Sequence, residues 1–186
     1  GITAKVTTME STIDNFKVGT RNYIVASDFN KALWKDYWKL SDGYGVYPYE
    51  KNYYYYHQAL LCINDTNNWI NANQCIDSLD ADTKYSFSFM AKGRCDVTIG
   101  EVIYDRDRNN NSYVDHTIEV DCEDWTKFST NFTTDINLRY AYVVISTKRH
   151  KTSGITLLKL EQGNILTDWT PAPEDSDYIT TGVVES

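Results

Sequence analysis

The chain lacks the sequence features of a membrane-spanning or nucleic-acid-binding protein. None of its apolar runs approaches the roughly 18 residues that a transmembrane helix needs, so we expect no membrane insertion. No signal peptide is visible at its start. Its 18 Lys and Arg residues form no basic cluster and are outnumbered by 26 Asp and Glu residues. The resulting net charge of −8 argues against nucleic acid as a partner.

Cysteine is scarce, and its spacing excludes the common zinc motifs. The four cysteines are Cys62, Cys75, Cys95 and Cys122, and no two of them form a Cys-x-x-Cys pair. In a protein assembled in the cytosol they would stay reduced. We therefore expect free thiols, with a Cys95–Cys122 bridge between neighbouring strands as the alternative.

The sequence also lacks a catalytic constellation. The three histidines, His57, His116 and His150, sit in unrelated contexts and suggest no Ser-His-Asp arrangement. Carboxylate pairs such as Asp105 and Asp107 say little about glycoside hydrolysis, because 26 acidic residues always bring some close together. We therefore expect no enzyme activity.

The segment Asp105-x-Asp107-x-Asn109 matches only the start of a calcium-binding loop. An EF-hand loop has Gly at its sixth position and Glu at its twelfth, where this chain has Asn110 and His116. Residues 105–111 are therefore expected to form a hairpin turn.

Aromatic residues, by contrast, are abundant. They make up 14% of the chain, and 15 of them are tyrosines. Such rings pack well on a pleated sheet, and exposed ones can stack on sugars while their hydroxyl groups form hydrogen bonds. The densest group, in residues 31–57, is interrupted by Gly43, Gly45 and Pro48, which predicts a loop with at most short strands.

The first 18 residues show a different pattern. Ile2, Val6, Met9, Ile13 and Phe16 are spaced by four, three, four and three positions, which makes a heptad seam. Two heptads do not form a coiled coil alone, so we expect the end of an upstream coiled coil or a linker helix. The seam is compatible with a trimer. An ordinary amphipathic helix packed on the domain is the alternative.

Most of the remaining chain has the alternation of β-strands. Residues 85–91 are the clearest case, with Tyr, Phe, Phe and Ala at every second position. Asn-rich residues 64–73 are predicted to be a loop. Further strands are expected at residues 23–25, 57–63, 96–104, 113–120, 125–133, 139–146 and 155–161. This set predicts an all-β fold, an antiparallel β-sandwich of jelly-roll type.

The last strand leads into a distinctive string. Residues 158–175 read LKLEQGNILTDWTPAPED. Gly163 predicts a turn, Trp169 is a large apolar anchor, and Pro171 and Pro173 cannot continue ladder pairing. The string predicts the end of a β domain and the start of a linker.

This string resembles the last strand of carbohydrate-binding-module-like β-sandwich domains in bacteriophage and prophage tail, baseplate and tail-fibre proteins. The pattern K-L-E-x-G-x-x-x-T-D-W-T-P-A-P-E-D matches from Lys159 to Asp175. Residues 21–29 resemble the first strand of the same family, R-N-L-L-x-x-x-D-F, with Tyr23 and Ile24 in place of the usual leucines. The resemblance covers roughly residues 20–175.

The resemblance implies a non-catalytic module that recognises host cell-wall or surface polysaccharide. Its location would be the virion tail, acting at the bacterial cell surface. Other phage tail subunits would be partners, and the full-length protein would be a homotrimer. The implied division is residues 1–18 for the coiled-coil end or linker helix, 19–173 for the jelly-roll β-sandwich and 174–186 for a C-terminal linker.

Two other functions stay open. One is a structural spacer or assembly domain of the tail fibre without sugar binding. The other is an accessory domain of a tail-associated cell-wall hydrolase. Burial of the aromatic rings between residues 34 and 57 would favour the spacer.

A sugar site needs exposed rings beside polar groups. We expect it to use residues from the aromatic loop, the Asn-rich loop and the hairpin, namely Trp34, Trp38, Tyr44, Tyr47, Trp69, Tyr104 and Arg106. Alternatively, Trp34 and Trp38 close the end of the sandwich.

The resemblance also implies a metal site, because jelly-roll carbohydrate modules often carry a structural calcium that joins the first and last strands. The ligands here would be Asp28, Asn30 and Asp168. These residues could instead cap turns.

Overall fold

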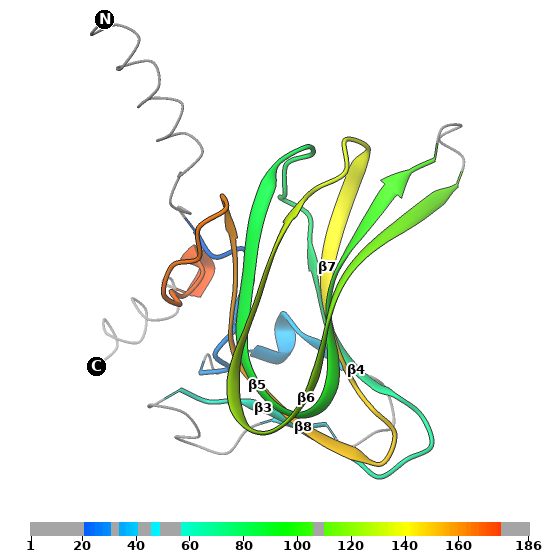
Figure 1. Ribbon diagram of the computed structural model, residues 1–186, viewed down its shortest axis with the longest axis vertical. Helices are drawn as coiled ribbons and strands as arrows, with labels where there is room; N and C mark the ends of the chain where they lie inside the picture. The colour runs from blue at the N-terminus through cyan, green and yellow to red at the C-terminus, as the bar shows by residue number, and fades with distance from the viewer. Residues whose placement is uncertain (1–20, 31–33, 41–45, 49–56, 106–109, 176–186) are drawn as a thin grey trace, which may run out of the picture.

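The computed structural model describes residues 21–30, 34–40, 46–48, 57–105 and 110–175 (Figure 1). The helix or coiled-coil end expected at residues 1–18 lies outside the described residues, as does the linker beyond residue 175. The elements are a 3₁₀ turn and eight strands: η1 (Trp34–Asp36), β1 (Lys39–Leu40), β2 (Val46–Pro48), β3 (Leu60–Asn64), β4 (Ile70–Ile76), β5 (Lys84–Tyr104), β6 (Asn111–Thr133), β7 (Leu138–Thr147) and β8 (Lys151–Gln162). Within this part of the chain, no helix is long and apolar enough to cross a membrane.

The strands form one antiparallel sheet that curls back on itself. β5 pairs with β6 along its length, with β8 through its first half and with β7 through its second half. β3 and β2 continue the sheet beyond β8, whereas β4 and β1 continue it beyond β7. Figure 1 shows β5 and β6 curving together from one half into the other. The predicted antiparallel jelly-roll sandwich is therefore confirmed, and we call its two halves the β7 half and the β8 half.

The curl occurs at Gly93. The register between β5 and β6 shifts between Ala91 and Gly93. Gly93 has a φ of +89°, and a Cβ atom there would lie 2.0 Å from the carbonyl oxygen of Thr152. Only glycine tolerates both conditions. The sequence predicted β5 and β6 each as two shorter strands that end at this bend, because the alternation of side chains is interrupted there.

The core lies between the two halves. Alternate residues of β5 supply Tyr85, Phe87 and Phe89 before the bend and Val97 and Ile99 after it, and all five are at most 1% exposed. Rings from β6 extend this packing, with Phe128 stacked on Phe89 at 5.4 Å and Phe132 stacked on Tyr85 at 6.1 Å.

Residues 21–30 are connected to the last strand without forming a strand themselves. The backbone N–H of Tyr23 donates to the carbonyl of Leu160 at 2.9 Å. The buried Asn22 side chain donates to the carbonyl of Leu158 at 2.9 Å and accepts from the N–H of Leu160 at 3.1 Å. The strand predicted at residues 23–25 is wrong, because the chain turns from residue 24 to residue 29 and reaches positive φ at Ala26.

β4 was predicted to be mainly loop. Ile70, Ala72, Gln74 and Ile76 are buried, while the residues between them face outward. Asn is unfavourable in strands on average, and this composition hid the alternation. Pairing with β7 from Ile70 to Ile76 overrides the local preference.

The C-terminal string is held over the β8 half by a buried ion pair. The ammonium of Lys159 lies 2.8 Å from the carboxylate of Glu161, and both side chains are at most 4% exposed. Lys159 also donates to the Thr167 hydroxyl and the Asp168 carbonyl, at 2.5 and 2.6 Å. The Glu161 carboxylate accepts from the N–H and the hydroxyl of Thr167. The motif residues therefore have a structural role in closing the domain.

Candidate functional site

The outward surface of the β7 half carries tyrosines from three neighbouring strands. Ala141 and Val143 of β7 point into the core, so the alternating Tyr140 and Tyr142 point outward. Val102 of β5 pairs with Tyr140 on one side and with Tyr113 of β6 on the other. Tyr104 follows two positions later on the same side of β5. We call the surface formed by Tyr104, Tyr113, Tyr140 and Tyr142 the tyrosine face.

Gly100 fixes how one of these rings lies. A Cβ atom at Gly100 would be 2.2 Å from Cζ of Tyr142, so the ring lies flat against the β5 backbone. The Tyr142 hydroxyl donates to a carboxylate oxygen of Asp115 at 3.3 Å. Burial is the main cause that raises the pKa of Tyr142, and the Asp115 carboxylate raises it further. Tyr113 and Tyr140 add to the same upward shift. The Tyr142 phenol therefore stays protonated and keeps its one O–H on Asp115.

Arg139 adds a cation to the tyrosine face. Its guanidinium carbon lies 5.4 Å from the ring centroid of Tyr104 and 6.0 Å from that of Tyr140. One guanidinium N–H donates to the side-chain oxygen of Asn111 at 3.2 Å. The rings themselves are accessible, since Tyr113 is 64% exposed and Tyr104 is 43% exposed. Flat rings beside a guanidinium and a carboxylate suit a ligand with apolar faces and many hydroxyl groups.

Polar groups continue along the same surface toward the other end of the strands. The hydroxyl groups of Thr98 and Thr117 lie 2.8 Å apart across β5 and β6. Lys148, just after β7, forms an ion pair with Glu119. Trp69 precedes β4, whose first residue pairs with the last residue of β7, so this indole lies at the same end as Lys148. It is 38% exposed.

The structure places the predicted ligand-binding residues in different environments. Tyr104 belongs to the tyrosine face, and Trp69 lies at the opposite end of the same half. Tyr44 and Arg106 lie outside the described residues, and for Tyr47 only its backbone position in β2 is described. Tyr104 and Trp69 reach the surface, and ligand binding by these two residues stays a prediction.

Trp34 and Trp38 require a correction. They are 3% and 1% exposed and pack against Phe29 at 5.7 and 5.5 Å. The indole N–H of Trp38 donates to the carbonyl of Ala26 at 3.3 Å. Neither ring has a face open to a sugar, so both belong to the core, as in the alternative interpretation.

Sequence reasoning missed Tyr113, Tyr140, Tyr142, Arg139 and Asp115. A signal was present in β7, because Tyr140-x-Tyr142 sets two rings on the side opposite Ala141 and Val143. The missing information was the strand order, which alone brings β6 and β7 to either side of β5.

Two of the three residues predicted to bind calcium, Asp28 and Asn30, are engaged in a turn, whereas the backbone carbonyl of the third, Asp168, accepts from Lys159. One carboxylate oxygen of Asp28 accepts from His57 Nδ1 at 2.9 Å and from the side-chain amide of Asn30 at 2.8 Å. The other accepts from the backbone N–H of Asn30 at 3.2 Å. In the described part of the chain, no three His, Cys, Asp or Glu residues form a group that could hold a metal. This arrangement fits a turn cap better than a calcium site.

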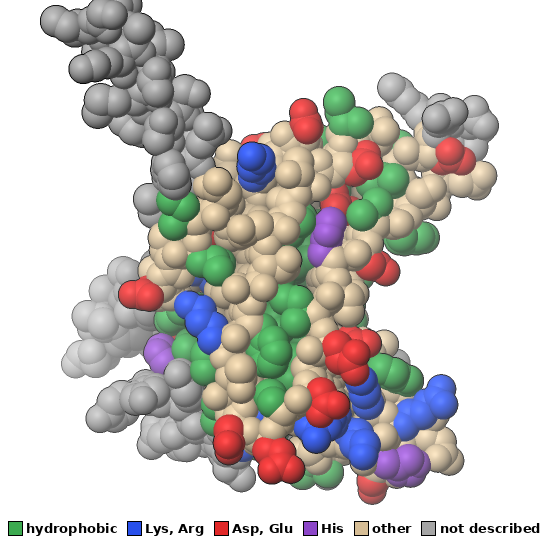
Figure 2. Space-filling view, in the orientation of Figure 1, with side chains coloured by type: hydrophobic (Ala, Val, Ile, Leu, Met, Phe, Trp, Pro, Cys, Tyr) green, Lys and Arg blue, Asp and Glu red, His purple; other side chains and the backbone are tan. Residues whose placement is uncertain are grey.

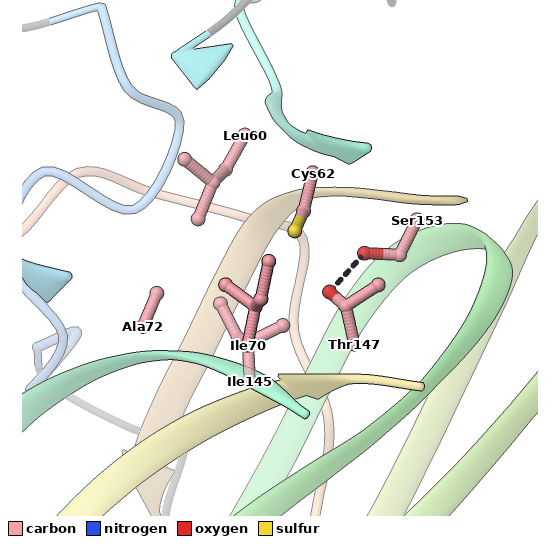
Figure 3. Close-up of a pocket in the computed structure, with 7 residues that line it drawn as sticks. All are labelled: Leu60, Cys62, Ile70, Ala72, Ile145, Thr147 and Ser153. Atoms are coloured by element: carbon pink, nitrogen blue, oxygen red, sulfur yellow. Dashed lines mark hydrogen bonds between the residues drawn. The ribbon is translucent and has the colours of Figure 1, made fainter. Parts of the chain in front are cut away.

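Two of the cavities that lie away from the tyrosine face are in the core and beside Trp169. The smaller, about 10 Å³, is enclosed in the core near Cys62 and the hydrogen-bonded hydroxyl groups of Thr147 and Ser153 (Figure 3), and is too small for an organic ligand. The larger, about 190 Å³, lies beside Trp169, Met90 and Lys127 on the β8 half. The Trp169 indole donates to the Ser27 hydroxyl at 3.0 Å, so this ring is an anchor, as expected.

All four cysteines are free thiols, and the alternative Cys95–Cys122 bridge is not formed. Burial raises the pKa of Cys95 to about 12 and also raises that of Cys62. These thiols therefore stay protonated and belong to the core rather than to a reactive site.

A jelly-roll sandwich with exposed rings on one sheet surface is compatible with carbohydrate binding, although the fold alone does not define a function. Residues 21–153 match the family model of the carbohydrate binding domain. The chain belongs to this family, which groups binding modules that are generally non-catalytic. No curated protein sequence matches the chain.

Solved structures of similar fold include free-standing modules and parts of longer chains. A family 16 carbohydrate binding module matches with a TM-score of 0.61 and 19% identity over 75% of this chain and 99% of that chain. The CBM22-1 xylan-binding domain of Paenibacillus barcinonensis Xyn10C matches with a TM-score of 0.54 and 14% identity over 81% and 99%. The enzymatically active domain of bacteriophage CBA120 tailspike protein 4 matches with a TM-score of 0.54 and 13% identity over 78% of this chain and 21% of that chain. At these identities the likeness concerns the fold.

Proposed function

We propose that the chain is a non-catalytic module that binds polysaccharide through the tyrosine face. The observation that carries this proposal is the convergence of four tyrosines, Arg139 and Asp115 on one accessible sheet surface. Family membership and the xylan-binding domain among the similar structures support a polysaccharide ligand.

The chemistry of the surface suits weak, reversible recognition. Tyr113 offers a ring face for stacking on the C–H face of a pyranose, while Arg139 and Asp115 offer a donor and an acceptor for its hydroxyl groups. Each hydrogen bond replaces one to water and therefore adds little net free energy. A homotrimer would raise the apparent affinity by presenting several sites at once.

The proposed setting is a bacteriophage or prophage tail, where the ligand would be a host cell-wall or surface polysaccharide. The C-terminal pattern from Lys159 to Asp175 supports it, as does the tailspike among the similar structures. The proposal includes location in the virion, contacts with other tail subunits and a trimeric full-length protein. Mass spectrometry of purified, induced particles tests the location, and sedimentation analysis of the full-length protein tests the trimer.

A spacer or assembly domain is the second candidate function. The burial of Trp34 and Trp38 favours it, because these two rings close the sandwich and have no face open to a ligand. An accessory domain of a cell-wall hydrolase is the third, supported by the enzymatically active tailspike chain that contains a similar fold.

A glycan array separates the binding module from the spacer. The wild type should bind a defined set of glycans. The Tyr113→Ala variant should bind these glycans with about tenfold lower affinity, because it lacks an exposed ring that stacks on the sugar. Tyr113→Phe keeps the ring and should retain most of the binding. Ile63→Ala is a matched control, because Ile63 is 56% exposed and lies in β3, on the β8 half away from the tyrosine face. A wild type that binds no glycan on the array would favour the spacer.

Calcium binding at Asp28, Asn30 and Asp168 stays a prediction. Addition of millimolar calcium to chelated protein would raise the melting temperature if these residues hold the ion, and Asp28→Asn would abolish the rise. An unchanged melting temperature would leave Asp28 as the turn cap that its contacts describe.

A further inference from the structure

We propose a second ligand site at the bend of β5, which takes an anionic group carried on a saccharide, either a sugar carboxylate or a phosphate. A cavity of about 350 Å³ opens there, between the start of β8 and the bend of β6. This volume falls within the range of small-molecule sites. The cavity is separate from the tyrosine face, because Lys92 in its wall pairs with Gly154 of β8 rather than with β7.

Three basic side chains line this cavity, namely Lys92, Arg94 and Lys151. Two carboxylates oppose them, that of Glu123 in the lining and that of Asp121, which pairs with Arg94. Such an excess of cations is unusual in a chain of net charge −8. Figure 2 shows basic side chains gathered, together with acidic ones, at the lower right of the molecule, where Figure 1 draws the turn between β7 and β8. The long-range field of an acidic protein repels anions, so anion binding here must come from these local charges.

Arg94 is held in place with donors to spare. Its Nε lies 2.6 Å from a carboxylate oxygen of Asp121. One Nη1–H donates to the carbonyl of Gly93 at 3.1 Å. These contacts occupy two of the five N–H donors of a guanidinium. The other N–H groups can pair with the oxygens of a carboxylate or phosphate in the two-pronged geometry that arginine favours.

Lys92 is also positioned by the fold. Its ammonium lies 5.3 Å from the ring centroid of Trp125, within range of a cation–π contact. The Trp125 ring itself rests against β8, since a Cβ atom at Gly154 would lie 3.1 Å from the indole. The stem of Lys92 is therefore confined beside the cavity before any ligand binds.

The floor of the cavity suits a sugar ring. Gly93 and Gly154 line it without side chains, so backbone atoms form part of the floor. A shallow, largely apolar floor with cations around it matches a pyranose that carries a charged substituent. The preference for an anion rests on Lys92, Arg94 and Lys151 alone, whereas the saccharide carrier rests on the proposed function.

Calorimetric titration with three probes tests the site. The probes are an oligogalacturonate, glucose 6-phosphate and neutral maltoheptaose, each at about 20 and 200 mM salt. We expect saturable binding of at least one anionic probe, at least tenfold weaker at the higher salt. Binding of the oligogalacturonate alone identifies a carboxylate ligand, and binding of glucose 6-phosphate alone identifies a phosphate ligand. If neither anionic probe binds at low salt, or maltoheptaose binds this site equally well, the proposal is overturned.

Four variants locate the binding. The double variant Lys92→Gln with Lys151→Gln should bind the anionic probe at least tenfold more weakly than the wild type. The double variant Lys35→Gln with Lys84→Gln removes the same charge elsewhere and should bind the probe as the wild type does. Glu123→Gln should strengthen binding about threefold, because it removes an opposing carboxylate. Equal losses in both double variants would overturn the site. Tyr113→Ala should leave anion binding intact, so failure of the tyrosine face and failure of this site are distinguishable.

Discussion

Lys159 and Glu161 form an ion pair of 2.8 Å beneath the C-terminal string, shielded from solvent on the outer side of the β8 half. Lys159→Met should lower the free energy of unfolding by about 3–5 kcal/mol, because it leaves a buried carboxylate without its counter-charge. Urea denaturation measures this loss.

The double variant Lys159→Met with Glu161→Gln is the control, since it removes both charges and keeps an acceptor for Thr167. It should be more stable than Lys159→Met alone. Equal or lower stability of the double variant would show that hydrogen bonds to Thr167, rather than charge pairing, hold the string.

Gly93→Ala should destabilise the protein far more than Gly154→Ala. At Gly93 the added Cβ meets backbone atoms at 2.0 to 2.9 Å, and φ is +89°. At Gly154 it meets only side chains of Leu61 and Trp125, at 3.0 Å or more. Thermal unfolding of the two variants measures the difference. Similar melting temperatures would mean that the bend does not depend on the backbone conformation at Gly93.

The stability of the fold should decline in alkali in a way that depends on Tyr85. Burial raises the pKa of Tyr85 from 10.0 to about 12, and its hydroxyl accepts from the N–H of Asp80 at 2.9 Å. The folded state therefore holds this proton more tightly than the unfolded state does. The resulting stabilisation is complete below about pH 10 and is lost as the pH rises toward 12.

Tyr85→Phe should therefore flatten the decline in unfolding free energy between pH 10 and 12, with Tyr113→Phe, an exposed ring, as the control. Because burial also raises the pKa of Cys95 to about 12, part of the decline should persist in Tyr85→Phe. An identical slope in the wild type and Tyr85→Phe would contradict this role of Tyr85.

The overall architecture could be predicted because its signals are local. The alternation in residues 85–91 and the string after Leu158 mark individual strands and the closing of the domain. What local patterns did not show was continuity: β5 and β6 each run through the bend at Gly93, where a register shift breaks the alternation. β4 was hidden for a different reason, because its outward residues include Asn71 and Asn73, and its pairing with β7 compensates for their low strand preference.

The candidate site was less predictable because it depends on strand order. Trp38 and Tyr113 are both aromatic residues near loops in the sequence, yet one is 1% exposed and the other 64% exposed. Aromatic density alone pointed to residues 34–57, where two indoles are needed to close the core. The tyrosine face appears only when β6, β5 and β7 are set side by side, which no single segment encodes.

The most direct test of the tyrosine face is a backbone amide chemical-shift titration with the glycan that binds best on the array. The largest shifts should fall in the second half of β5, the first half of β6 and β7, centred on Tyr113, Tyr140 and Tyr142. Shifts confined to the β8 half, or none at saturating glycan, would contradict the account.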